Sequence, residues 1–244
     1  MALLVVSGIA SASEAPSYAF GAGVQHIPSW IGASTHRNQL LPYVDIDLPE
    51  IGELSTVDGL TVDLIHGTHW HGGPYGNYMW GRSHEDLGTL GGKVTSLSPR
   101  LQGGGYIEYA FDEQWSVGSR VSHDTDGAGA YLDVYGDLKL PDIGYIEQSF
   151  ELQWQAMNGP AMRRFFGLSA DEATSIGTAP WRPGAGAQMA YIEYDAFLPT
   201  SEHTGFALSI NIGRLLGAAA NSPLVRSYGS RTQISQTLAF VYHF

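Results

Sequence analysis

The chain has 244 residues, a formal net charge of −12 at neutral pH and no cysteine. The negative charge argues against nucleic acid as a partner, and the lack of cysteine excludes disulfides and cysteine-based metal or redox sites. No apolar run approaches the roughly 18 residues of a membrane-spanning helix. Charged residues make up only 15%, against about 25% in ordinary soluble proteins, while 6 Trp, 13 Tyr, 9 Phe and 31 Gly are present. This composition is typical of a transmembrane β-barrel, in which lipid-facing and lumen-facing residues alternate.

The first fifteen residues differ from the rest. An apolar stretch from Ala2 to Ala10 is followed by Ala10-Ser11-Ala12, which is typical of the end of a secretory signal peptide, although the usual basic start is missing. We predict that residues 1–15 are the remnant of a cleaved signal, with a first strand as the alternative. Residues 16–244 are then one all-β barrel domain.

Strand-like segments follow along the chain. Eleven are found, over 17–28, 39–49, 59–67, 72–82, 101–112, 115–125, 128–140, 144–157, 184–198, 203–216 and 231–244. Most have the length of a tilted strand that crosses a bilayer, about 9–11 residues or slightly more, and exceed the strands of soluble sheets. Because bacterial single-chain barrels have even strand counts, we predict a transmembrane antiparallel β-barrel of twelve strands, with ten as the alternative.

Several segments alternate cleanly between two faces. In the last one, Ile234, Leu238, Phe240, Tyr242 and Phe244 lie on one face and small or polar residues on the other. The same parity places a set of acidic residues on the face away from lipid: Asp45, Asp47, Asp63, Asp133, Asp137, Glu147, Glu151, Glu193 and Asp195. They either line open water as a cation-favouring lumen, or pair with Arg82, Arg120 and tyrosines in a filled polar core.

The connections between the segments are of two kinds. Short turns are expected at 111–115, 140–144 and 198–202, and long loops at 84–100, 158–183 and 216–230. Short turns on the periplasmic side and longer extracellular loops are the pattern of outer-membrane barrels. In the second long loop, Ser169 with Glu172 three residues on predicts a capping box that opens a short helix.

Several stretches carry a more specific resemblance. They are Gly21-Ala22-Gly23-Val24, Gly32-Ala33-Ser34, Leu41-Pro42-Tyr43, Phe165-Phe166-Gly167-Leu168-Ser169, Gly184-Ala185-Gly186, Arg214-Leu215-Leu216-Gly217, Asn221-Ser222-Pro223-Leu224-Val225 and Gly229-Ser230-Arg231-Thr232-Gln233. Together they resemble the MipA/OmpV family of outer-membrane proteins across nearly the whole mature chain. The match is weaker over 66–100, and His243 replaces the usual basic residue before the final Phe244.

The resemblance implies a barrel in the outer membrane of a Gram-negative cell, in contact with outer-membrane lipid. It also implies a non-enzymatic scaffold for cell-wall remodelling, whose partners are a periplasmic lytic transglycosylase and a peptidoglycan synthase. A narrow channel or porin for cations or small polar solutes is the alternative, and a lipid hydrolase is a third hypothesis. Fold alone does not choose between them.

Two groups of residues bear on chemistry. His66, His69 and His71, with His84 nearby, have a spacing that could bind metal, but no carboxylate or cysteine stands at matching spacing, so a polar rim or lumen is the favoured interpretation. Ser122-His123-Asp124 contains the residue types of a hydrolase triad. Adjacent strand residues point to opposite faces, so Ser122 and His123 are not expected to meet. We therefore predict no catalytic residues, no cofactor and no metal site.

Overall fold

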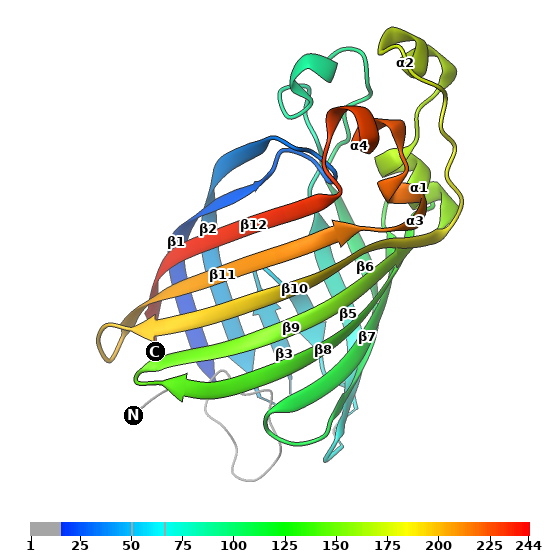
Figure 1. Ribbon diagram of the computed structural model, residues 1–244. Helices are drawn as coiled ribbons and strands as arrows, with labels where there is room; N and C mark the ends of the chain where they lie inside the picture. The colour runs from blue at the N-terminus through cyan, green and yellow to red at the C-terminus, as the bar shows by residue number, and fades with distance from the viewer. Residues whose placement is uncertain (1–15, 50, 66) are drawn as a thin grey trace.

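The computed structural model describes residues 16–49, 51–65 and 67–244. It is a closed antiparallel barrel of twelve strands, each paired with its sequence neighbours, and the last strand closes onto the first (Figure 1). The strands are β1 (Ser17–Pro28), β2 (His36–Leu48), β3 (Gly52–Ser55), β4 (Gly59–Val62), β5 (Trp70–Met79), β6 (Arg100–Ala110), β7 (Trp115–Asp124), β8 (Ala130–Ile143), β9 (Ile146–Met157), β10 (Gly186–Pro199), β11 (Thr204–Leu215) and β12 (Thr232–His243). The predicted all-β transmembrane barrel of twelve strands is confirmed, whereas the predicted signal peptide over residues 1–15 lies outside the described residues.

Short helices lie in the connections. They are the 3₁₀ helix η1 (Gly88–Leu90) and the α-helices α1 (Gly159–Phe166), α2 (Ala170–Ser175), α3 (Gly217–Ala220) and α4 (Pro223–Tyr228). Within the described parts of the chain, no helix is long and apolar enough to span a membrane. The capping box predicted at Ser169 and Glu172 is present and opens α2.

The two faces of each strand have different environments. On β12, Leu238 and Phe240 point outward and are about half exposed (54% and 50%), whereas Ala239 and Val241 between them are each 1% exposed. Aromatic rings contact one another near one end of the barrel, where Tyr109 packs edge-on against both Trp70 and Phe111. An outward apolar band with aromatic residues at its edge is what the bilayer requires of a barrel, so the predicted parity is confirmed.

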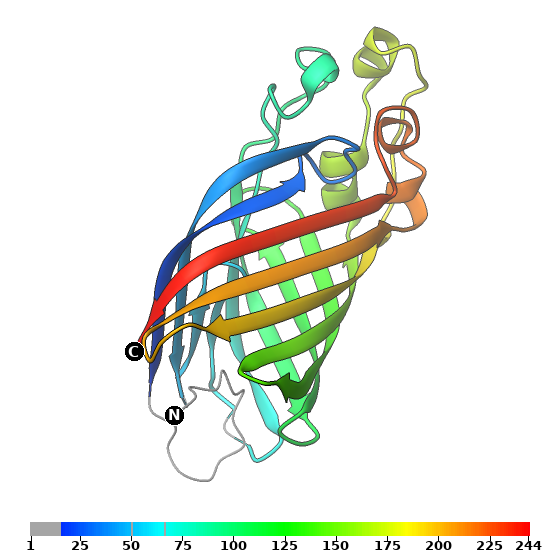
Figure 2. The same ribbon diagram turned by 60° about the vertical axis from the view of Figure 1, so that its left-hand side comes forward.

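The long and short connections lie at opposite ends of the barrel. The segments 80–99, 158–185 and 216–231 rise together at one end, while the turns after β6, β8 and β10 and the C-terminus lie at the other (Figures 1 and 2). In outer-membrane barrels the short turns are periplasmic. We call the end with the long loops the outer end and the end with the short turns the periplasmic end.

One part of the barrel wall departs from the sequence prediction. The segment 59–67 was expected to be one strand, but β4 ends at Val62, and β3 had no counterpart in the prediction. Both strands have four residues, which is too few for alternation to be recognised. As a result, β2 pairs with β3 only over Asp45–Leu48, and β4 pairs with β5 only through Leu60 and Thr61.

The upper halves of β2 and β5 are therefore sheet edges, and the chain protects them. Pro42 has no N–H to offer a foreign strand, and the N–H of Tyr78 donates to the Asn77 side-chain oxygen at 2.6 Å. Near the outer end, Arg37 of β2 forms an ion pair of 2.5 Å with Asp86 in the loop after β5. This contact ties the two edges together above the short β3–β4 hairpin.

Candidate functional site

The first candidate site is the inner face of the barrel, which carries the predicted acidic residues. Strand register places Asp137 of β8 opposite Glu151 of β9, and Glu151 opposite Glu193 of β10. Three acidic side chains thus lie side by side across neighbouring strands. Glu193 is satisfied locally, because Ser209 Oγ and Asn211 Nδ2 donate to its carboxylate at 2.5 and 2.9 Å. The inward placement predicted for these residues is confirmed.

Asp63 is the one predicted inward acid that does not lie on a strand. It follows the end of β4, in the connection to β5 at the periplasmic end, and is not part of a strand. Its carboxylate oxygen lies 4.0 Å from Nδ1 of His71, which belongs to β5. The strand expected over 59–67 ends before Asp63, but the contact with His71, which points into the barrel, keeps the Asp63 carboxylate on the inward side.

Arg120 of β7 is the cation that faces these acids at mid-barrel. Its guanidinium lies 4.2 Å from the ring centre of Tyr135 and 5.6 Å from that of Tyr75, so it is held between two aromatic faces. Tyr135 in turn donates a 3.0 Å hydrogen bond to Glu108 of β6. The predicted pairing of an inward acid with a tyrosine is present at Glu108 and Tyr135, while Arg120 contacts the rings of Tyr75 and Tyr135.

The inner face is closely packed at this level. Tyr75, Tyr135 and Gln153 are between 2% and 6% exposed, although they point into the barrel. Packing depends on glycine where a large ring crosses the lumen: a Cβ at Gly118 would lie 2.2 Å from Cζ of Tyr135. This arrangement favours the filled-core hypothesis, because a twelve-stranded barrel is narrow enough for side chains to occupy much of it.

The prediction that Arg82 pairs with the inward acids inside the barrel is wrong. β5 ends at Met79, so Arg82 lies in the outer loop, where it donates to the carbonyls of Phe165 at 2.9 Å and Thr95 at 3.2–3.3 Å. Burial lowers its pKa to about 10, which leaves it protonated at neutral pH. Arg82 therefore joins the loops to one another instead of balancing the acids inside the barrel.

The second candidate site is the cap at the outer end, which consists of α1 to α4 with the loops 29–35 and 80–99. Apolar side chains from these segments form the main hydrophobic cluster of the protein together with the upper ends of β8, β9 and β11. Met162, Phe166 and Leu224 are completely buried in it. Figures 1 and 2 show α1, α3 and α4 at the barrel rim, with α2 and η1 above them.

The family-like motifs meet in this cap. Ser222 Oγ, from the Asn221–Val225 stretch, donates to the carbonyl of Phe166 at 2.8 Å. Gln233 accepts a 2.9 Å hydrogen bond from the Gly32 N–H and donates to the Ala33 carbonyl at 3.2 Å. Segments some 200 residues apart are thereby joined. The motifs thus hold the loops of the outer end together. The sequence alone did not predict these contacts, because it gives no distances between residues of separate loops.

Glu172 links α2 to the loop 80–99. Its carboxylate accepts hydrogen bonds from the Ser169 N–H at 2.8 Å and from the N–H and hydroxyl of Thr95 at 2.9 and 2.7 Å. Partial burial works to raise its pKa, but these hydrogen bonds outweigh burial and lower the pKa to about 2. The stabilisation is therefore complete above the ordinary carboxyl pKa of about 4.5 and is lost as the pH falls toward 2.

This network gives a testable pH dependence. After correction for intrinsic exchange rates, the Thr95 amide is expected to exchange slowly at pH 5 and to lose protection toward pH 2. In Glu172→Gln the neutral amide accepts weaker hydrogen bonds, so protection is lower and nearly independent of pH. Asp171→Asn, which alters the neighbouring exposed acid, is the control. Hydrogen exchange read by mass spectrometry checks this, and unchanged Thr95 protection in Glu172→Gln contradicts it.

The histidines do not converge on one point. His69 precedes β5 and its Nδ1 lies 2.9 Å from the Ala110 carbonyl, whereas His71 points into the barrel beside Asp63. His66 lies outside the described residues. Among the residues that are described, no group of three or more His, Cys, Asp or Glu is arranged to hold a metal ion.

The Ser122-His123-Asp124 string is divided between the two faces of β7, as predicted. Ser122 is buried and donates to Gln102 at 2.6 Å, while His123 Nδ1 contacts the Asp124 carbonyl at 2.6 Å. The Asp124 carboxylate is engaged elsewhere, by Arg100 and by the Tyr131 hydroxyl, each at 2.9 Å. This local geometry lacks the nucleophile-to-base contact that acyl transfer requires.

Together, these features define the class of the protein: an outer-membrane β-barrel with a packed polar interior and a helical cap at its outer end. The family model for MipA, the MltA-interacting protein, matches residues 20–244, and the chain belongs to this family. No curated protein matches the sequence.

Some solved structures of outer-membrane proteins show limited similarity to this chain. A bacterial polysaccharide outer-membrane secretin is 10% identical, with 96% of this chain and 99% of that chain covered and a TM-score of 0.40. An anion-selective porin from Comamonas acidovorans is 10% identical, with 94% and 99% covered and a TM-score of 0.34. The outer membrane protein OprD from Pseudomonas aeruginosa is 8% identical, with 98% and 96% covered and a TM-score of 0.33. At these TM-scores the similarities carry no functional conclusion.

Proposed function

We propose that this protein is a non-enzymatic scaffold, a single barrel domain over residues 16–244 that holds a lytic transglycosylase, and through it a peptidoglycan synthase, at the periplasmic face of the outer membrane. Family membership is the observation that carries the proposal, because the family is named for its interaction with MltA, a lytic transglycosylase. The packed interior and the cap support a scaffold over a pore, since both reduce the space through which solutes could pass.

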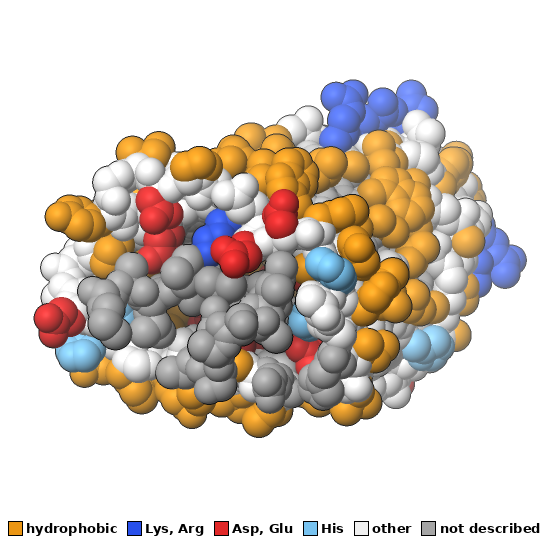
Figure 3. All heavy atoms as spheres, turned by 90° about the horizontal axis from the view of Figure 1, so that it is seen from below, with side chains coloured by type: hydrophobic (Ala, Val, Ile, Leu, Met, Phe, Trp, Pro, Cys, Tyr) orange, Lys and Arg blue, Asp and Glu red, His pale blue; other side chains and the backbone are white. Residues whose placement is uncertain are grey.

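The periplasmic end offers a surface for such a partner. Phe111, Ile143 and Tyr145 are 56%, 65% and 84% exposed in its turns. Acidic residues of the same turns are also exposed, namely Asp112, Glu113, Asp142 and Glu202. Figure 3 shows acidic side chains on this face, with apolar side chains around its outline. Exposed aromatic and aliphatic groups beside acids suit a partner with a basic, partly apolar patch.

A binding measurement tests the scaffold. The refolded barrel in detergent is expected to bind purified lytic transglycosylase, and Asp112→Asn/Glu113→Gln/Asp142→Asn is expected to weaken binding about tenfold, chiefly through slower association. The control is Glu85→Gln/Asp126→Asn, which neutralises two exposed acids at the outer end. No binding by the unmodified barrel overturns the proposal, and equal binding by all three proteins overturns this choice of surface.

The channel hypothesis has a separate test. In planar bilayers at neutral pH and at about pH 3, we expect no discrete single-channel steps from protein whose folding is shown by heat-modifiable gel mobility. Cation-selective steps that shrink at the acid pH, and that are also reduced in Asp133→Asn, would favour the channel instead. In that case the inward acids line open water.

A further inference from the structure

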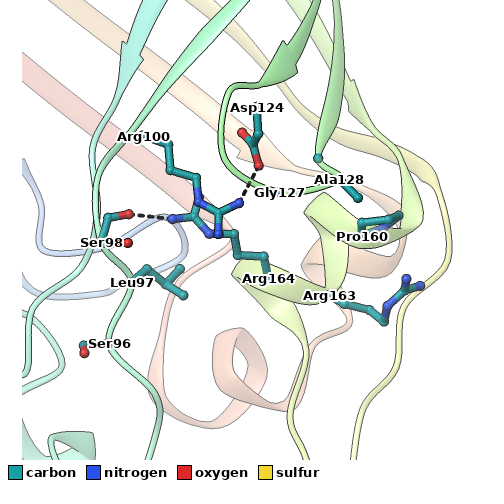
Figure 4. A pocket seen from close by; sticks show the side chains of 11 residues that line it. Ser96, Leu97, Ser98, Arg100, Asp124, Gly127, Ala128, Pro160, Arg163 and Arg164 are labelled. Atoms are coloured by element: carbon teal, nitrogen blue, oxygen red, sulfur yellow. Dashed lines mark hydrogen bonds and ion pairs between the residues drawn. The ribbon is translucent and has the colours of Figure 1, made fainter.

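A pocket at the outer end contains three arginines that the scaffold does not use. It has a volume of about 470 Å³ and lies between the start of β6, the β7–β8 loop and α1 (Figure 4). Arg100 comes from β6, and Arg163 and Arg164 come from the last turn of α1. Asp124 at the end of β7 is the acidic residue in the pocket lining.

The charges in this pocket do not balance. Asp124 has a fully buried side chain and is engaged by Arg100 Nη1 and by the Tyr131 hydroxyl, each at 2.9 Å. Arg164 Nη2 donates to the Ser98 carbonyl at 2.5 Å, which supplies no negative charge. One carboxylate therefore faces the guanidinium groups of Arg100 and Arg164, whereas the Arg163 side chain points away from them, and about one positive charge remains uncompensated in the centre of the pocket (Figure 4).

Two of these guanidinium groups are held close together. Figure 4 shows the Arg100 and Arg164 side chains side by side in the centre of the pocket. Burial lowers the pKa of Arg164, and the nearby Arg100 lowers it further by like-charge repulsion. The Nε atom of Arg100 is buried and has no hydrogen-bond partner among the described residues. An anion between the two groups would relieve the repulsion and use donors that are otherwise idle.

The wall beside Arg100 is built from small residues. Gly127 has a φ of +123°, and a Cβ there would lie only 2.2 Å from Arg100 Nη1. A side chain at this position would displace the guanidinium or fill the pocket. Gly127 and Gly129 thus let the β7–β8 loop pack directly against Arg100 and Asp124 at one side of the pocket.

We propose that this pocket binds a phosphate group, carried either by a phosphorylated glycolipid of the outer leaflet or by a small soluble phosphate ester. The planar guanidinium fork matches the oxygens of a phosphate and can donate two parallel hydrogen bonds to it. The outer end of the barrel is where the headgroups of outer-leaflet lipids lie. The two sources share the same phosphate chemistry and differ in the acyl chains.

Binding to defined probes tests the proposal and separates the two sources. The refolded barrel is titrated in detergent with inorganic pyrophosphate and, in nanodiscs, with bisphosphorylated lipid A or its dephosphorylated form. A rise in melting temperature with pyrophosphate supports a soluble ligand, and a rise with lipid A alone supports a lipid ligand. No response to either phosphate probe, or an equal response to dephosphorylated lipid A, overturns the proposal.

Matched variants test the residues. Arg163→Gln/Arg164→Gln is expected to weaken phosphate binding tenfold or more, and Arg226→Gln/Lys93→Gln, which removes two exposed cations outside the pocket, is expected to bind like the unmodified protein. The single variant Arg164→Gln, which removes one of the two guanidinium groups in the centre of the pocket, keeps the test valid if the double variant does not fold. Equal weakening by the Arg226/Lys93 control pair means non-specific attraction and overturns the site. Because the pocket lies at the end opposite the periplasmic turns, transglycosylase binding is expected to be unaffected in every variant.

Discussion

Replacing Arg120 by glutamine is expected to lower the free energy of unfolding by about 3 kcal/mol at neutral pH, near the lower end of the range for breaking a buried charge cluster. Glu108, Asp133, Asp137 and Glu151 all interact electrostatically with the Arg120 guanidinium. Without it, carboxylates that lie opposite one another in register repel with no cation to offset them. Urea unfolding in detergent, followed by tryptophan fluorescence, measures the loss.

Two further variants separate charge from position. Arg120→Lys keeps the charge but loses the flat contact with Tyr135, so an intermediate loss is expected. Lys139→Gln removes a cation from the strand β8 near the periplasmic end, where it faces Ser149 across the ladder, and about 1 kcal/mol or less is expected. If Arg120→Gln unfolds at the same urea concentration as the unmodified protein, the arginine does not hold the acids together.

The lumen was predictable because strand parity is a local property. Once alternate residues of a strand are assigned to lipid or lumen, Asp133, Glu151 and Glu193 must face inward, since an ionised group in the acyl layer is costly. The same reasoning failed for Arg82, because β5 ends three residues earlier than the pattern suggested. Beyond Met79 the chain leaves β6, and Arg82 pairs instead with Leu97 of its own loop through backbone hydrogen bonds of 2.9 and 2.8 Å.

The cap and the arginine pocket were beyond sequence reasoning for a different reason. Arg100, Asp124 and Arg164 lie on three separate segments, and each is unremarkable in its own segment. Their proximity depends on how two long loops fold back over the barrel rim. The family resemblance identified several of these loop segments by their sequence motifs. A sequence motif does not show, however, that Phe166 and Ser222 are in contact.

The second large effect is expected from Phe166→Ala in the cap. Phe166 is completely buried, and removal of a buried phenyl ring costs about 3–5 kcal/mol. This loss of stability is expected to affect the cap and not the barrel, because the hydrogen bonds between the barrel strands do not involve the Phe166 side chain. A cost of about 3 kcal/mol raises the population of the opened cap roughly a hundredfold.

Trypsin cleavage after Arg163 and Arg164 reports this opening, since both bonds lie in or at the end of α1 and are protected while the helix is packed. In Phe166→Ala the cleavage rate is expected to rise by about the same factor as the opened population, provided opening and closing are fast relative to cleavage. Heat-modifiable gel mobility should stay unchanged, because the twelve-stranded ladder remains closed. Phe111→Ala, at an exposed periplasmic turn, is the matched control and should cleave at the original rate. Loss of heat-modifiable mobility in Phe166→Ala would instead mean that the cap and the barrel unfold as one cooperative unit.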